Sequence, residues 1–170
     1  VILYFTNMKN RENTFEKTRN YLFELTKHNA EKIDKEFLEI AYTSRGIKNF
    51  VESSKSFSEK EIYDFIVEYL KIDSDNVGAG MAFLPYKFSP KKEKYAIFVH
   101  PENGDYLISD LTKQYNYLTD DWFLIPSLLK KEYMTEPFWG KVSKTPLVIH
   151  TAPIFKDNEL VGISFADISL

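Results

Sequence analysis

The feature that most constrains the fold is a long stretch of helical spacing near the N-terminus. From Phe15 to Val51, apolar or small residues recur at steps of three and four, with mostly charged and polar residues between them. No proline occurs before Pro85, and the first glycine is Gly46, where a break is one alternative. We predict one helix over residues 1–51. A helix of about 40 residues is roughly 60 Å long, more than one small sheet can cover, so we expect a homodimer through this helix.

A second helix is predicted directly after the first. Ser58 and Glu61 have the spacing of a capping box, in which each side chain binds the other residue's backbone amide. Behind them, apolar residues follow the spacing of one helical face: Ile62, Phe65, Ile66, Tyr69 and Leu70.

After Asp73 the period changes to that of strands. Asn103-Gly104 supplies the positive φ angles of a tight hairpin turn, and Lys156–Glu159 has turn composition. Thr119 is expected to cap a short helix that ends near Lys131, with Pro126 in its first turns. We predict strands at 77–84, 95–99, 106–108, 147–155 and 160–168.

This order of elements indicates an α+β domain. Hairpin-joined strands give an antiparallel sheet, and helices pack against its faces. A chain of 170 residues is one domain's worth. We therefore expect residues 1–170 to form a single domain of PAS-like layout, with the sheet and a pocket in residues 77–170.

Composition excludes several classes of function. The net charge is −3 with basic and acidic residues interleaved, which disfavours nucleic-acid binding. There is no cysteine, so disulfides and thiolate chemistry are excluded. His28, His100 and His150 lack metal-ligand spacing, and no nucleotide or nucleophile motif occurs. We predict no enzyme activity, no metal and no cofactor.

The chain ends suggest a membrane context. Residues 1–5 are apolar, as in the last turn of a membrane helix, although no complete span is present. We expect flanking segments to anchor the domain in a membrane.

Four motifs in the C-terminal half carry a family resemblance. Residues 121–126 are similar to an Asp-Trp-Tyr-x-x-Pro segment, and residues 135–139 to a (Ser/Thr)-Glu-Pro-Tyr strand. Residues 152–162 are similar to a strand-turn-strand motif, and residues 166–170 to a closing Val-Asp-Ile-Ser-Leu. In this order the motifs resemble those of Cache (PDC) sensor domains, across about residues 77–170.

The resemblance implies an extracytoplasmic (periplasmic or extracellular) domain of a transmembrane receptor that senses a small molecule. Such receptors feed chemotaxis modules, histidine kinases or cyclic-dinucleotide enzymes. The ligand would bind between the sheet and the short helix, and the long helix would carry the signal.

The resemblance also implies candidate ligand-binding residues. Laid on the amino-acid-sensing branch of the family, Tyr115, Trp122 and Asp167 match, whereas Asp120 replaces an arginine that would grip a carboxylate. Further positions that align with this site are Phe123, Phe138 and His150. Two carboxylates beside aromatic faces favour a neutral or cationic ligand.

Plainer interpretations stay open. Each aromatic residue is also explained by core packing, and Asp167 by binding backbone amides. Alternatives for the whole chain are a dimerisation scaffold with a vestigial pocket and a small soluble enzyme. Membrane spans on both sides of this sequence would distinguish a receptor domain from an enzyme.

Overall fold

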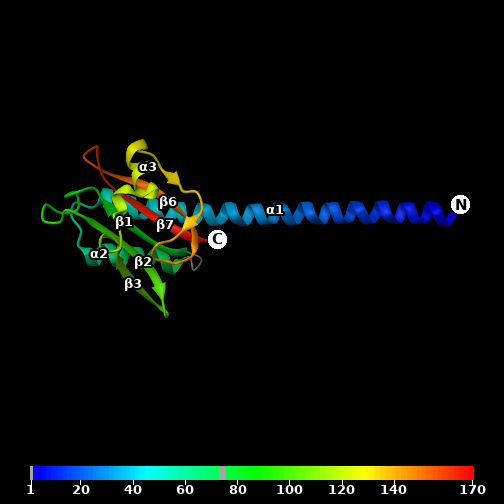
Figure 1. The fold of residues 1–170 in the computed structure, drawn as a ribbon, viewed down its shortest axis with the longest axis horizontal. Coiled ribbons are helices and arrows are strands. Elements are labelled where there is room, and N and C mark those ends of the chain that lie inside the picture. The colour runs from blue at the N-terminus through cyan, green and yellow to red at the C-terminus, as the bar shows by residue number, and fades with distance from the viewer. Residues whose placement is uncertain (1, 73–75) are drawn as a thin grey trace. The chain divides into compact units, whose positions relative to one another are not determined.

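The computed structural model describes residues 2–72 and 76–170, with the side chains of residues 8–72 and 77–170. The chain divides into two compact units, one up to Glu36 and one from Phe37 to Leu170 (Figure 1). The first helix (α1) spans Ile2–Ser53, and the sequence predicts it over residues 1–51. Val1 lies outside the described residues.

The part of α1 within the first unit has mostly exposed side chains from Met8 onward. Ion pairs between residues three or four apart line it, such as Arg19 with Glu16 at 2.8 Å. Large apolar side chains are also exposed along it: Met8, Phe15, Tyr21, Leu22, Phe23, Leu25 and Ile33. This segment therefore has unpartnered apolar surface of its own.

The part of α1 after Phe37 is buried along one stripe. Ile40, Ile47 and Val51 are fully buried, and their spacing matches the predicted helix face. The helix runs through Gly46 without a break. A Cβ at this position would lie 2.4 Å from the ring of Tyr69, so the glycine allows the second helix to approach closely.

The second helix (α2) spans Glu59–Ile72, and its predicted capping box is confirmed. The amide of Glu61 donates to Ser58 Oγ at 3.2 Å, and the amide of Ser58 donates to Glu61 Oε2 at 2.7 Å. The buried face of α2 consists of Ile62, Ile66, Val67 and Leu70.

The strands form one seven-stranded antiparallel sheet in the order β3-β2-β1-β7-β6-β4, with β5 also pairing β6. This confirms the α+β fold with a long N-terminal helix. The strands are β1 (Asn76–Phe83), β2 (Tyr95–Glu102), β3 (Asp105–Asp110), β4 (Tyr133–Met134), β5 (Phe138–Trp139), β6 (Pro146–Lys156) and β7 (Glu159–Ser169).

Two predicted turns have the expected backbone conformation. Asn103 and Gly104 have φ angles of 53° and 86°, and Asp157 and Asn158 have φ angles of 49° and 64°. Two successive positive φ angles match the right-handed twist of the strands that such a turn joins. Sequence alone therefore located both hairpins.

The two faces of the sheet carry separate apolar cores. The C-terminal part of α1 and all of α2 pack on one face, where β6 contributes Val148 and Ile154. The other face is covered by two short 3₁₀ helices, η1 (Leu111–Lys113) and η2 (Tyr117–Thr119), and by α3 (Asp121–Leu129). On this face β6 contributes Leu147 and Ile149, so successive residues of β6 face different layers.

The start of α3 differs from the prediction. The N-cap residue is Asp120, and Thr119 belongs to η2, where its hydroxyl donates to the carbonyl of Asn116 at 3.1 Å. The prediction that Thr119 caps the helix was therefore wrong. The helix ends at Leu129, where Lys130 adopts a left-handed conformation with a φ of 53°.

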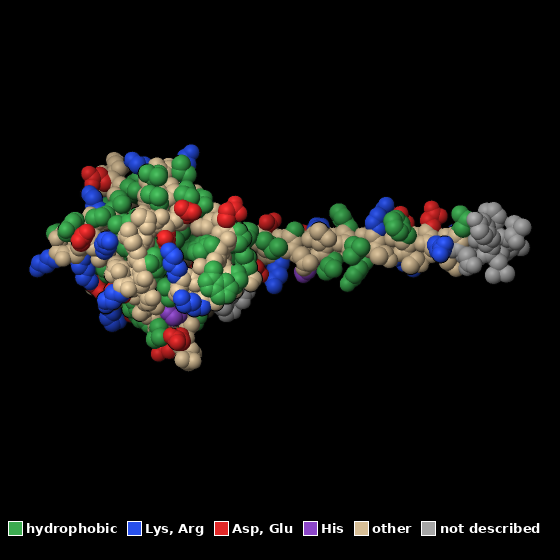
Figure 2. All heavy atoms as spheres, in the orientation of Figure 1, with side chains coloured by type: hydrophobic (Ala, Val, Ile, Leu, Met, Phe, Trp, Pro, Cys, Tyr) green, Lys and Arg blue, Asp and Glu red, His purple; other side chains and the backbone are tan. Residues whose placement is uncertain are grey.

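Charged side chains of both signs are interspersed over the face of the domain that Figure 2 shows. Within residues 2–72 and 76–170, no helix combines the length and the apolar character needed to span a bilayer. The expected membrane turn at residues 1–5 rests on Val1 and on side chains outside the described set.

Candidate ligand pocket

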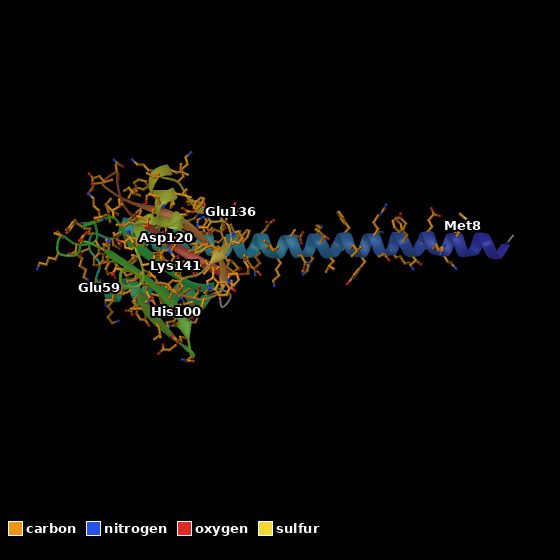
Figure 3. All side chains as sticks on the ribbon, viewed as in Figure 1. Met8, Glu59, His100, Asp120, Glu136 and Lys141 are labelled. Carbon is orange, nitrogen blue, oxygen red and sulfur yellow. The ribbon has the colours of Figure 1, made fainter. Side chains whose placement is uncertain are left out.

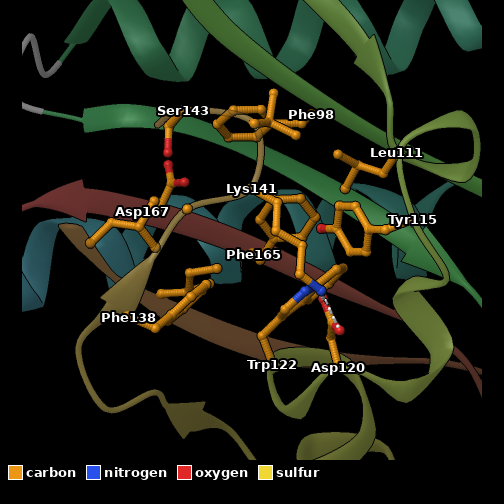
Figure 4. Close-up of a pocket in the computed structure, with 14 residues that line it drawn as sticks. Phe98, Leu111, Tyr115, Asp120, Trp122, Phe138, Lys141, Ser143, Phe165 and Asp167 are labelled. Atoms are coloured by element: carbon orange, nitrogen blue, oxygen red, sulfur yellow. Dashed lines mark hydrogen bonds and ion pairs between the residues drawn. The ribbon is translucent and has the colours of Figure 1, made fainter. Parts of the chain in front are cut away.

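A pocket lies between the sheet, α3 and the loop that joins β5 to β6 (Figure 4). Its cavity volume is about 40 Å³, and about 390 Å³ when all the space around it, open solvent included, is counted. The lining residues come from β2, η1, the chain between η1 and α3, α3 itself, β5, the β5–β6 loop, β6 and β7. They are Phe98, Leu111, Tyr115, Asp120, Trp122, Phe138, Gly140, Lys141, Val142, Ser143, Leu147, Ile149, Phe165 and Asp167.

Aromatic side chains form the walls. Trp122 is buried and packs on Phe165 of β7, with ring centroids 4.7 Å apart. The ring centroid of Phe165 in turn lies 6.1 Å from that of Phe98 on β2. Behind them, the hydroxyl of Tyr117 donates to the carbonyl of Phe83 at 2.7 Å, which ties η2 to the sheet. The walls are therefore formed by side chains of the sheet and of the helical layer that covers it.

The deep end of the pocket holds two unsatisfied polar atoms. Asp167 Oδ1 and Ser143 Oγ are buried without a hydrogen-bond partner among the described residues. Their side chains point toward one another in Figure 4. Asp167 is only 3% exposed, and burial raises its pKa well above the usual range, against the opposing effect of the backbone amides of Asp167 and Gly78. Burial therefore shifts this carboxyl group toward its neutral form.

The mouth of the pocket carries an ion pair. Lys141 Nζ donates to both carboxylate oxygens of Asp120, each at 2.7 Å. The ammonium group also lies 4.4 Å from the centroid of the Tyr115 ring. Burial, together with the nearby Asp120 carboxylate, raises the pKa of Tyr115, so its hydroxyl keeps its proton. The charge of Asp120 is thus compensated locally.

A second, outer hollow adjoins the pocket. It holds about 750 Å³ of space, open solvent included, between the start of α3 and the chain around β4 and β5. It shares Asp120, Trp122, Phe138 and Lys141 with the inner pocket. Asp120 and Lys141 lie beside each other in Figure 3, with Glu136 of the outer hollow near them. The ion pair therefore borders both spaces.

The structure brings five of the predicted site residues together: Tyr115, Asp120, Trp122, Phe138 and Asp167. Phe123 does not line the pocket. It is buried in the core beneath, with its ring 5.1 Å from that of Tyr117.

His150 corrects a further expectation, because it lies on the opposite face of the sheet. The pocket takes Leu147 and Ile149 from β6, so the intervening and following residues face α1. His150 Nδ1 lies 2.6 Å from Ser44 Oγ of α1. Burial lowers the pKa of His150, although Glu132 lies 3.7 Å away and opposes this.

Several lining residues were absent from the predicted site. Lys141 and Ser143 lie in an irregular loop, where no periodicity indicates which way a side chain points. The loop is tight, because a Cβ at Gly140 would lie 2.1 Å from Ser143 Oγ. Phe98 and Phe165 were identifiable as strand residues, but alternation alone does not tell which face meets α3.

Comparisons with solved structures agree with this fold. The extracellular domain of the histidine kinase mmHK1S-Z3 superposes with a TM-score of 0.71 at 21% identity, over 81% of this chain and 54% of that one. Methyl-accepting chemotaxis protein X superposes with a TM-score of 0.71 at 16% identity, over 90% of this chain and 64% of that one. The ligand-binding domain of the Pseudomonas aeruginosa PAO1 amino acid chemoreceptor PctC, in complex with GABA, has a TM-score of 0.61 at 15% identity. The superposition covers 90% of this chain and 61% of that one.

This chain thus spans between about half and two thirds of each of these structures. Among curated protein sequences, none matches it. The family model that matches residues 62–170 is described as "Methyl-accepting chemotaxis protein-like, first PDC sensor domain". Together with the sheet, the long helix and the pocket facing α3, this match establishes that the chain belongs to the family of PDC sensor domains first in order in methyl-accepting chemotaxis protein-like receptors.

Proposed function

We propose that residues 1–170 act as one extracytoplasmic sensor domain of a transmembrane receptor, and that the inner pocket binds a small organic ligand. The observation that carries the proposal is the pair of unpartnered buried atoms, Asp167 Oδ1 and Ser143 Oγ, at the deep end of an aromatic pocket. Buried polar atoms are nearly always hydrogen-bonded in folded proteins. A bound ligand would supply the missing partners.

The charges around the pocket attract a cation less strongly than two free carboxylates would. Asp120 is paired with Lys141, and burial raises the pKa of Asp167. The earlier expectation of a neutral or cationic ligand assumed two free carboxylates. With one carboxylate paired and the pKa of the other raised by burial, the attraction for a cation is weakened.

The receptor context rests on family membership. Similar folds include the PctC domain described above and the ligand-binding domain of the Campylobacter jejuni chemoreceptor Tlp3, in complex with 4-methylisoleucine. We infer that membrane segments outside this chain anchor the domain, and that α1 transmits the signal toward a chemotaxis or kinase module.

A thermal-shift screen tests ligand binding. Amino acids, amines, carboxylates and nucleobases are added to the isolated domain, and a specific ligand is expected to raise the Tm by several degrees. A ligand at about 100 times its Kd stabilises by roughly 2.7 kcal/mol, equivalent to a Tm rise of about 5–11 °C in a domain of this size.

Variants then locate the binding site. Asp167→Asn, which preserves shape, and Trp122→Ala are expected to abolish the shift. Trp139→Ala is the matched control, because Trp139 is 63% exposed and lines neither hollow. A ligand that stabilises all three variants as it does the wild type would place binding elsewhere.

A second proposal concerns assembly. The exposed apolar side chains of α1 before Glu36, such as Phe15 and Leu22, favour pairing with a second copy of this helix. We propose that the receptor is a homodimer through this segment. Dimerisation and ligand sensing are compatible, so the scaffold interpretation gains support only if no ligand binds.

A further inference from the structure

Lys141 is the one cationic side chain among the residues that line the inner pocket. Its ammonium group is held at the mouth by Asp120 on one side and by the Tyr115 ring on the other. In Figure 4 the side chain extends from the β5–β6 loop toward Asp120, alongside the pocket that it lines. A ligand that enters through the mouth would therefore pass this group.

The pairing of Lys141 is replaceable. The side chains of Lys141 and Asp120 are 53% and 22% exposed, respectively. Ion pairs this close to solvent contribute little net stability, because water competes for both partners. A negative group on a ligand can take the place of the Asp120 carboxylate at small cost.

We propose that Lys141 is the specificity-determining residue of this pocket, and that it exchanges Asp120 for a carboxylate group of the ligand. This inference rests on the proposed ligand-sensing function and deepens it. It assigns the anion-binding role to Lys141 of the β5–β6 loop. The resemblance described above places an arginine for this role two positions before Trp122, and that residue is Asp120 in this chain.

The opposite end of the pocket completes the ligand's description. Asp167 and Ser143 offer unpartnered oxygens at the deep end, and aromatic side chains line the space between the two ends. The ligand class is a small carboxylate with a short apolar body. A further polar group that reaches the deep end would also satisfy Asp167 and Ser143.

A plainer role for the ion pair is structural. In that case Asp120 and Lys141 only fasten the β5–β6 loop to the start of α3, and a ligand would leave the pair intact. The two roles differ in the effect of Asp120→Asn. If Asp120 competes with the ligand, its neutralisation strengthens carboxylate binding; if it only fastens the loop, neutralisation weakens binding or leaves it unchanged.

The test uses nine probes in three matched series, measured by thermal shift and calorimetry on the 170-residue domain. The amino acids are L-alanine, L-leucine and L-phenylalanine. Each is compared with its carboxamide, which lacks the negative charge, and with its deaminated analogue (propanoate, 4-methylpentanoate or 3-phenylpropanoate), which keeps the carboxylate. At least one of the three series is expected to have an apolar body that fits the pocket. In that series the amino acid and its deaminated analogue should bind at least about tenfold more tightly than the carboxamide, because the carboxamide cannot form the charge-assisted hydrogen bond to Lys141.

Four variants complete the design. Lys141→Met is expected to remove the preference for carboxylates, Lys141→Arg to retain it, and Asp120→Asn to tighten carboxylate binding up to about fivefold. Lys131→Met is the control, because Lys131 is exposed and lines neither hollow.

The outcomes separate this inference from the proposed function. Equal binding of amides and carboxylates, or a carboxylate preference that survives Lys141→Met, overturns the role of Lys141 and leaves ligand sensing intact. If neither the nine probes nor the wider screen stabilises the wild type, sensing itself loses its support, and this inference fails with it.

Discussion

The hydroxyl of Ser44, on the long helix, lies 2.6 Å from Nδ1 of His150, on β6. Ile149, the residue before His150, lines the inner pocket, so β6 contacts the pocket on one side and α1 on the other. The hydroxyl of Ser164 on β7 also donates to the backbone carbonyl of Ser44 at 2.8 Å. A buried polar contact therefore joins α1 to the central strands directly behind the pocket.

Removing the Ser44 hydroxyl is expected to destabilise the fold. Ser44→Ala leaves His150 Nδ1 buried without this partner, which costs about 1–3 kcal/mol for an unsatisfied buried group. Urea unfolding followed by circular dichroism measures the loss. Ser53→Ala is the control, because its hydroxyl makes an exposed bond to the carbonyl of Phe50; equal effects of the two changes would contradict the prediction.

His150 should make stability fall in mildly acidic solution. Burial lowers its pKa below the ordinary 6.5, so the unfolded chain binds a proton that the folded domain refuses. The stability present above pH 6.5 is therefore lost as the pH falls through the folded-state pKa. In His150→Gln this loss should disappear, which urea titrations between pH 5 and 8 would reveal as a flatter profile. An unchanged profile would mean that His150 has the same pKa in the folded and unfolded states.

Asp167 should have the opposite dependence on pH. Its folded-state pKa is raised above the ordinary 3.8, so the folded domain holds a proton that the unfolded chain releases. The wild type is therefore most stable, relative to Asp167→Asn, at low pH, and this advantage declines as the pH rises through the folded-state pKa. Paired unfolding curves at pH 4 and 8 measure the difference. A relative stability that rises with pH would show that Asp167 is ionised in the fold.

The first unit of α1 should form crosslinks between two copies of the intact receptor. Met8, Phe15 and Leu22 are exposed and recur at seven-residue steps, the spacing of a coiled-coil seam. Because the chain has no cysteine, single cysteines at positions 15 and 22 report only on this face. Oxidation of membranes should yield disulfide-linked dimers.

Cysteines at Lys17 and Glu24, on the other side of the helix, serve as controls for that scan. Each lies two residues beyond a seam position, which is roughly 200° around the helix axis. Crosslinking that is equal on both sides, or absent from positions 15 and 22, would argue against a helix-mediated dimer. The isolated domain can remain monomeric in either case, because without membrane anchors the effective concentration is low.

The sequence by itself determined the elements whose signals are local. Apolar residues at steps of three and four located α1 and α2. The capping box of Ser58 and Glu61 located the start of α2, and Asn103-Gly104 located a hairpin. Each signal depends on residues at most a few positions apart, so the backbone conformation follows from contacts that the neighbouring residues make themselves.

The tertiary structure alone decided which side chains meet at the pocket. Alternation placed His150 and Ile149 on opposite faces of β6, but both faces are buried, so only the packing of α1 and α3 determined which face is the pocket. Lys141 reaches Asp120 across 21 residues from an irregular loop, and no periodic pattern encodes such a contact. Loop side chains are positioned by the layers around them, and that arrangement forms only when the sheet and α3 pack together.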